Sequence, residues 1–110
     1  MTINTRNVYD VLIADLAGRL DSTTAGEASD ELVRIARSGN GKVVLNLAEL
    51  EYVSSAGLSA ILRAAKLLQA AAGELKICNP KAVVKEVLET SGFHSLLRIY
   101  ESEQEAVAAY

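Results

Sequence analysis

Tryptophan is absent from this 110-residue chain, and histidine, cysteine and proline each occur once. The single cysteine cannot form an internal disulfide, which is typical of a chain from a reducing cytoplasm. A membrane-spanning helix needs about 20 predominantly apolar residues. The longest apolar stretch, residues 56–72, is interrupted by four polar or charged residues, and the polar start at residues 1–6 lacks the apolar core of a secretory signal. We therefore expect a cytoplasmic protein with no membrane partner.

Groups that support catalysis or metal binding are also scarce. His94 is the only histidine, so no Ser-His or Cys-His pair can form without it, and we interpret it as a surface or packing residue. Cys78 lies in an apolar strand pattern, which favours a small buried hydrophobe over a reactive thiol. The chain has no Cys/His cluster and no glycine-rich phosphate loop. These absences predict a protein that is not an enzyme and that has no catalytic residues and no metal site.

Charge and aromatic content argue against nucleic acid as a partner. The chain carries 11 lysines and arginines against 14 aspartates and glutamates, a net charge of −3, with four tyrosines and one phenylalanine. A phosphate-binding surface or a base-stacking platform would need more positive charge and more aromatic rings. A chain of this length buries roughly 65% of its unfolded surface, so we expect one domain spanning residues 1–110.

Apolar patterning predicts strands that alternate with helices. One or two strands are expected within residues 8–17, a central parallel strand at 42–47, and further strands at 74–79 and 98–100. Residues 48–53 read as a connection. Short loops between alternating strands and helices are typical of a small α/β domain.

Helix ends are predicted from capping residues. Thr24 and Glu27 form a candidate capping box for a first helix that ends before Gly39, and Gly73 is expected to end the second helix. Asn79 is expected to cap a third helix that begins at Pro80 and buries Val83, Val84, Val87 and Leu88. Ser102 and Glu105 form a second capping box, for a terminal helix that we expect to pack lightly.

One turn, residues 52–58, places two hydroxyls at the start of a regular helix. Unpaired backbone N–H groups favour an anion there, so a phosphate on Ser55 would be stabilised. The alternative is that Ser54 or Ser55 is simply the helix N-cap. Asp21 has two interpretations as well, a turn residue or a second polar group beside this loop, since both segments follow strands of one expected parallel sheet.

Residues 43–58 resemble the characteristic segment of STAS-domain anti-sigma-factor antagonists, in which a strand and a short connection lead to Asp-Ser-Ser/Thr-Gly-Leu at a helix start. Gly18-Arg19-Leu20-Asp21 with Thr24-Ala25 resembles the Gly-x-Leu-Asp...Thr-Ala step of that family. Ser91-Gly92-Phe93 resembles its late Ser-Gly-Leu/Phe. The resemblance covers nearly the whole chain and implies the STAS fold, a small mixed, largely parallel sheet with packed helices.

The resemblance also implies a role for each residue of the turn. The phosphoacceptor serine of the family motif falls on Ser55, and the preceding Asp falls on Ser54. The second hydroxyl of the motif is replaced by Ala56, so only Ser54 competes with Ser55 as the acceptor. The partner-binding residues implied by the resemblance are Asp21, Ser54, Ser55, Ala56, Gly57 and Leu58.

The function that this resemblance implies is a phosphorylation-controlled switch. The unphosphorylated chain would dock on an anti-sigma factor, a serine protein kinase of the histidine-kinase-like ATPase type; phosphorylation of Ser55 would end the docking, and a serine phosphatase would restore it. ATP and magnesium would belong to the kinase, so no cofactor is expected here. The alternative is a docking module of a larger, transporter-associated assembly that works without phosphorylation. A nucleotide-binding enzyme would need a phosphate loop that the sequence lacks.

Overall fold

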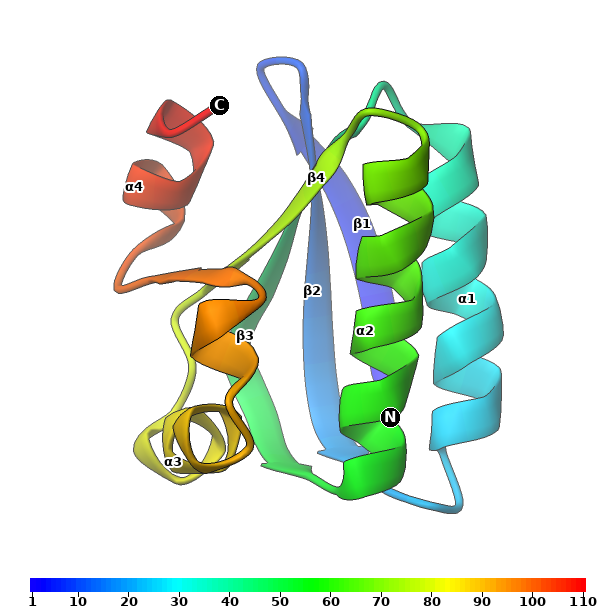
Figure 1. Ribbon diagram of the computed structural model, residues 1–110, viewed down its shortest axis with the longest axis vertical. Coiled ribbons are helices and arrows are strands. Elements are labelled where there is room, and N and C mark those ends of the chain that lie inside the picture. The colour runs from blue at the N-terminus through cyan, green and yellow to red at the C-terminus, as the bar shows by residue number, and fades with distance from the viewer.

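Five strands form one sheet in the computed structural model, which describes the backbone of residues 1–110 and every side chain except that of His94. The expectation for the His94 side chain therefore lies outside the described residues. The spatial order is β1-β2-β3-β4-β5 (Figure 1). The first pair is antiparallel and the others are parallel, which confirms the small α/β fold with a mixed, largely parallel sheet. The strands are β1 (Thr2–Val8), β2 (Val11–Leu20), β3 (Lys42–Val53), β4 (Glu74–Cys78) and β5 (Arg98–Tyr100).

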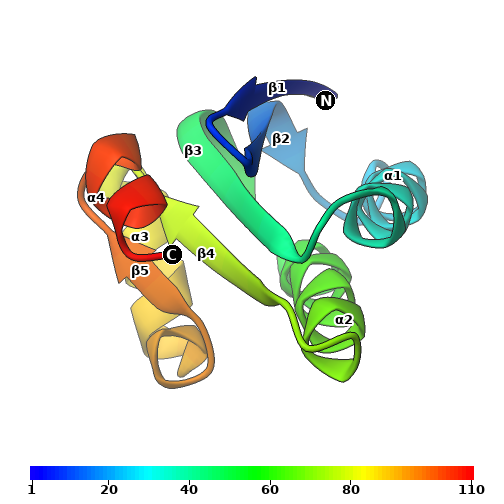
Figure 2. The ribbon, with the colours of Figure 1, turned by 90° about the horizontal axis from the view of Figure 1, so that it is seen from above.

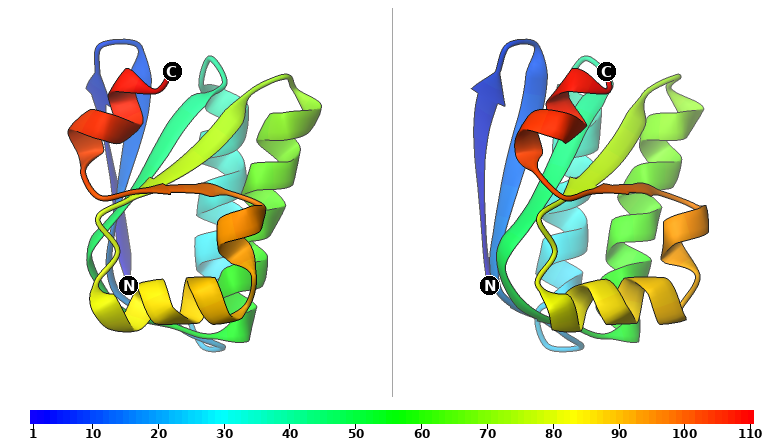
Figure 3. Two further views of the ribbon diagram at one scale, coloured as in Figure 1. Left: turned by 60° about the vertical axis from the view of Figure 1, so that its left-hand side comes forward. Right: turned by 90° about the vertical axis from the view of Figure 1, so that its left-hand side faces the viewer.

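Helices cover both faces of this sheet. Two of them, α1 (Ala25–Ser38) and α2 (Ser55–Ala70), lie side by side on one face (Figure 2). The helix α3 (Ala82–Thr90) and the short 3-10 helix η1 (Phe93–Ser95) join the core on that side. The last helix, α4 (Glu103–Ala108), lies on the opposite face (Figure 3).

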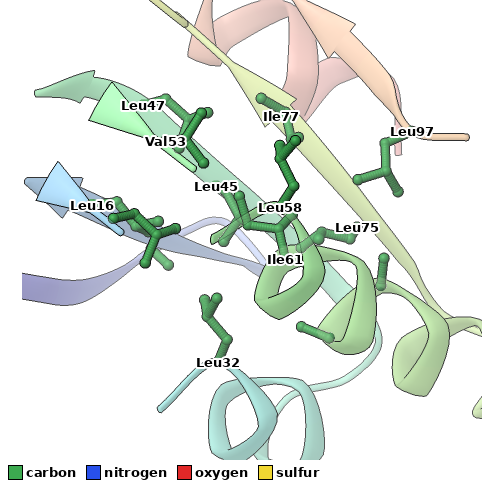
Figure 4. Close-up of a cluster of buried hydrophobic side chains, with 14 of the residues drawn as sticks. Leu16, Leu32, Leu45, Leu47, Val53, Leu58, Ile61, Leu75, Ile77 and Leu97 are labelled. Carbon is green, nitrogen blue, oxygen red and sulfur yellow. The ribbon is translucent and has the colours of Figure 1, made fainter. Parts of the chain in front are cut away.

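The main core lies between the sheet and the first three helices. Figure 4 shows aliphatic side chains of the strands meeting those of α1 and α2. Leu45 and Leu47 of β3 and Ile61 of α2 are all fully buried. On the other face of β3, Val44 is equally buried beneath α4. The prediction that residues 42–47 form a central strand covered on both faces is therefore confirmed.

The same strand is longer than predicted. We expected residues 48–53 to be a connection, but β3 continues through them and stays paired with β2 up to Val53. Leu50 and Val53 point into the core, whereas the residues between them are exposed. Two irregularities in the pairing of β2 with β3 interrupt the simple alternation of a strand. Polar residues at the exposed positions made this segment look like a loop.

The first helix begins after Thr24 as expected but lacks the expected capping bond, and the expected start of the third helix was wrong. Thr24 makes no capping hydrogen bond, because its hydroxyl donates to the carbonyl of Arg19 (2.8 Å). The third helix begins at Ala82 rather than Pro80. Asn79 has a positive φ of 56°, and its side-chain amide donates to the carbonyl of Glu101, so it connects the chain segments after β4 and β5 instead of capping α3.

Two expectations about helices α2 and α3 also need correction. α2 ends at Ala70, before Gly73, and the residue with the left-handed backbone is Ala72. Gly73 is needed for another reason: a Cβ there would lie 2.6 Å from the carbonyl oxygen of Gly41. In α3, Val83 is 52% exposed and lies outside the core that Val84 and Leu88 enter.

The terminal helix α4 packs more firmly than expected. Ser102 is the N-cap as expected, since its hydroxyl accepts a hydrogen bond from the amide of Glu105 (3.1 Å); the Glu105 carboxylate accepts from that hydroxyl (3.0 Å) and not from the Ser102 amide, so only half of the capping box forms. Ala106 is fully buried, and the hydroxyl of Tyr110 donates to the carbonyl of Val43 in β3 (2.6 Å). Short alanines let the helix lie close to the sheet, and the tyrosine supplies the long-range contact. A count of large apolar residues alone could not reveal this.

Cys78 should react slowly with thiol reagents in the native protein. It is fully buried between the sheet and α4, and this burial raises the pKa of its thiol to about 12. Because only the thiolate is nucleophilic, both access and ionisation are suppressed. Absorbance after addition of an aromatic disulfide should rise slowly in buffer and rapidly in guanidinium chloride. Equal rates in the two solutions would contradict the placement of Cys78.

Candidate functional site

The candidate site lies where β2 and β3 end beside each other. Leu20 pairs with Val53 across the two parallel strands, and the amide of Ser54 donates to the carbonyl of Leu20 (2.9 Å). Asp21 is the first residue after β2 and Ser54 is the first after β3, so both lie at the carboxyl ends of these neighbouring strands. We call this end of the sheet the edge. The expectation that both turns follow strands of one parallel sheet is confirmed.

Ser54 and Ser55 have different structural roles. Ser54 is the N-cap of α2: its backbone is extended, and its hydroxyl oxygen accepts a hydrogen bond from the amide of Gly57 (3.3 Å). Ser55 is the first residue of the helix and is exposed. Its hydroxyl makes no hydrogen bond within the described part of the chain. The capping role thus falls on Ser54 and leaves the Ser55 hydroxyl accessible.

The remaining residues of the motif seat the first turn of α2 on the sheet. A Cβ added to Gly57 would lie 2.7 Å from the carbonyl oxygen of Leu20 and 3.0 Å from a methyl group of Val53. Only glycine therefore allows this close approach. Leu58 is buried in the core, whereas Ala56 is exposed next to Ser55. The exposed surface of the turn thus consists of a hydroxyl and a methyl group.

Asp21 holds the turn before α1. Its carboxylate accepts hydrogen bonds from the amide (3.0 Å) and the hydroxyl (2.7 Å) of Thr23. These hydrogen bonds lower the pKa of Asp21, so the carboxylate is charged at neutral pH. Its contacts in the described structure lie within its own turn and with Arg19, whose Nε is 3.8 Å away. Asp21 is thus both a turn residue and an anionic neighbour of the Ser54–Ser55 turn.

A pair of residues that the sequence analysis did not single out flanks this edge. Arg19 and Tyr52 are cross-strand partners, and the guanidinium carbon of Arg19 lies 4.4 Å from the centre of the Tyr52 ring. Such a cation–π contact supplies a flat, partly apolar surface that still carries a positive charge. Finding this pair from sequence would have required knowing that β3 continues to Val53.

The described residues contain no group of three or more histidine, cysteine, aspartate or glutamate side chains that could hold a metal ion. No helix among them is both long and apolar enough to span a membrane. The site is an exposed helix start with an accessible hydroxyl. Such a surface can be recognised by a partner protein, and its hydroxyl can be modified by a protein.

Ser54→Asp should leave the stability of the fold nearly unchanged. An aspartate is a good N-cap, and its charge interacts favourably with the helix dipole by roughly 0.3–1 kcal/mol. Ser54→Ala, the matched control, should lose about 1 kcal/mol because the amide of Gly57 loses its acceptor. Thermal unfolding followed by circular dichroism distinguishes the two variants. A large loss for Ser54→Asp would show that the half-buried Ser54 position does not tolerate a charge.

Comparisons with known proteins agree with this geometry. The family model of the STAS domain matches residues 2–106. BtrV of Bordetella bronchiseptica, whose description assigns it to the anti-sigma factor antagonists, is 39% identical over 110 residues, which are 100% of this chain and 95% of BtrV. The anti-sigma F factor antagonist of Paenibacillus polymyxa is 33% identical over 98 residues, 88% of this chain and 84% of that protein.

Solved structures show the same fold. The phosphorylated form of the Bacillus cell fate determinant SpoIIAA matches with a TM-score of 0.72 and 20% sequence identity, over 98% of each chain. The mixed sheet with packed helices thus agrees with the fold that the resemblance in the sequence implied. This chain belongs to the STAS domain family.

Proposed function

We propose that this chain is an anti-sigma factor antagonist. It binds an anti-sigma factor through the turn between β3 and α2 while Ser55 is unphosphorylated. The observation that carries the proposal is the division of labour between the two serines: Ser54 caps the helix, and the Ser55 hydroxyl stays exposed. The binding surface comprises the exposed Ser55 and Ala56, with Asp21 and Ser54 beside them; Gly57 and Leu58, expected from the resemblance to bind the partner, are buried and support the turn from beneath. Residues 1–110 act as one STAS domain in this function.

The switch itself is a phosphoryl transfer carried out by the partner. The Ser55 Oγ attacks the γ-phosphorus of ATP, the bond to the β-phosphate oxygen breaks, and ADP leaves while the hydroxyl proton passes to a base of the kinase. This chain supplies only the nucleophile, so it is a substrate rather than an enzyme and needs no cofactor of its own. A serine phosphatase uses water to release inorganic phosphate and regenerates the hydroxyl. All these partners act in the cytoplasm.

The phosphorylated chain keeps its fold in this scheme. A phosphoserine carries about −1.5 to −2 charges at neutral pH. At the first residue of α2 that charge faces unpaired backbone amides and the positive end of the helix dipole. The domain therefore tolerates the group, and the effect of the charge falls on the partner that covers the turn.

Phosphate mapping tests this function. Wild type, Ser54→Ala and Ser55→Ala are incubated with ATP and a purified anti-sigma kinase from the same organism, and modified peptides are identified by mass spectrometry. We expect one phosphate on wild type and on Ser54→Ala, and none on Ser55→Ala. Modification of Ser54 alone would contradict the proposal. A wild type that is neither bound nor modified by the kinase would favour the docking-module alternative.

A further inference from the structure

The exposed face of α2 carries positive charge below the Ser55 turn. Ser59, Leu62 and Lys66 follow Ser55 at intervals of four, three and four residues, which places all four side chains on one face of the helix. Arg63 lies beside them. The helix has no aspartate or glutamate, so these two cations are its only charged side chains. The face that begins at Ser55 thus becomes basic about two to three turns further along the helix.

Three shallow hollows join along this face. The first lies between α1 and α2 and is lined by Arg37 and Arg63 among others. The second shares Arg63 with the first and adds Leu62 and Lys66. The third, a groove of about 910 Å³ between α2 and the segment from η1 to β5, shares Leu62 and Lys66 and ends at Arg98. The hollows therefore adjoin one another across α1, α2 and the start of β5.

We call this surface the basic strip; it contains Arg37, Leu62, Arg63, Lys66, Leu96 and Arg98. Two carboxylates, Asp30 and Glu74, also line the hollows, so cations outnumber carboxylates there without excluding them. Of the 11 lysines and arginines in the chain, the strip holds the four that form no ion pair with any side chain that the structure describes. The other seven are paired with carboxylates; two of these pairs lie at the hollows, Arg34 with Glu31 and the buried Lys76 with Glu74. Uncompensated positive charge is therefore gathered on one side of a chain whose net charge is −3.

Apolar side chains lie among these cations. Leu96 is 63% exposed at the groove, and Leu62 is only partly buried beside it. Exposed apolar groups rimmed by charge mark interaction sites rather than solvated surface. A partner that fits must present apolar side chains to the leucines and carboxylates to the cations around them.

We infer that the basic strip docks an acidic, amphipathic segment of the anti-sigma factor, so that the partner reaches across α2 from the Ser55 turn to Arg98. This inference rests on the proposed function and adds the chemistry of the partner surface. An anionic membrane suits the strip less well, because the chain is acidic overall and has only four cations here. Nucleic acid would need more phosphate contacts and stacking rings than the strip offers.

Such a strip acts first on the rate of association. Charges at the rim of an interface steer the encounter and make it sensitive to salt, whereas buried contacts govern dissociation. Because the strip runs along the helix that begins at Ser55, steering by the cations would bring the partner onto the face of α2 that carries the phosphorylation site. The strip and Ser55 then contribute separately to the same complex.

The test compares two variants with the same change in charge. Arg63→Glu/Lys66→Glu reverses two of the four unpaired cations and so cancels their summed charge, and Lys42→Glu/Lys85→Glu reverses two cations that are ion-paired elsewhere. Binding of each variant to the purified anti-sigma factor that binds wild type is measured by surface plasmon resonance at 50 and 300 mM NaCl. We expect the strip variant to bind at least tenfold more weakly at low salt, mainly through slower association, and to lose most of its salt dependence. The control should bind within about twofold of wild type.

Further outcomes separate this inference from the proposed function. Leu96→Ser should weaken binding while the salt dependence stays that of wild type, because it removes only an apolar contact. If wild type binds in a Ser55-dependent way and the strip variant binds equally well, the basic strip is not the docking surface although the proposed function holds. If wild type does not bind at all, the proposed function fails first. If wild type and the control variant sediment with phosphatidylglycerol vesicles but the strip variant does not, the strip is a membrane-binding surface and the inference is overturned.

Discussion

Ser55→Asp is expected to weaken binding to the anti-sigma factor about a hundredfold while the chain melts close to wild type. The substituted carboxylate lies at the first residue of α2, where the helix stabilises negative charge in the free protein. In the complex, the same charge must be desolvated against a surface that fits a hydroxyl and the methyl group of Ala56. An unpaired buried charge costs several kcal/mol, and about 3 kcal/mol corresponds to a hundredfold loss of affinity.

Ser55→Ala is the matched control for this result. It removes the acceptor hydroxyl without adding charge, so binding should equal that of the unphosphorylated wild type and should not respond to ATP. Isothermal titration with the anti-sigma factor measures the affinities of wild type, Ser55→Asp and Ser55→Ala. Phosphorylated wild type, measured in the same way, should behave like Ser55→Asp. Tight binding by the phosphorylated chain would remove the basis for the switch.

Gly57→Ala is expected to destabilise the fold by about 1–3 kcal/mol, although alanine is the better helix former. The new Cβ would lie 2.7 Å from the carbonyl oxygen of Leu20, an atom of the backbone that cannot rotate away. Relief requires the start of α2 to move off the end of β2. This movement also displaces Ser55, so affinity for the anti-sigma factor should fall together with stability.

Gly26→Ala provides the comparison within the same molecule. Gly26 lies near the start of α1, and nothing is within 4 Å of the position of an added Cβ. Only the helix preference remains there, so the melting temperature should rise by a few degrees. Guanidinium unfolding of both variants gives the two free energies directly. An equal gain in both would mean that the approach of Gly57 to Leu20 is not tight.

Much of the fold could be predicted from apolar spacing alone. The buried pattern of residues 42–47 identified the central strand, and the spacing of Leu58, Ile61 and Leu68 identified the face of α2 that packs on it. Residues 48–53 were wrongly predicted to be a connection, because irregular pairing with β2 decides which of their side chains are buried. Local patterns do not contain that information.

The candidate site, too, could be predicted only in part from the sequence. The motif and its position before a helix were evident in the sequence, but two hydroxyls in a row left the cap undecided. Tertiary structure decides between them: the amide of Ser54 is held by the carbonyl of Leu20, which orients its hydroxyl toward the amide of Gly57. At Thr24 tertiary structure has the opposite effect: its hydroxyl was expected to cap α1, but it donates a hydrogen bond to the carbonyl of Arg19 instead.

Placement of the two apolar clusters on opposite faces of the sheet gives the molecule two separable zones of local stability. Only α4, among the helices of residues 1–110, contributes side chains to the cluster around Cys78. Detachment of α4 is thus a sub-global opening that leaves the larger core and the edge beside Ser55 intact. Labelling of Cys78 then reports the free energy of that single event. The thiol is a built-in sensor that distinguishes fraying at the C-terminal helix from global unfolding.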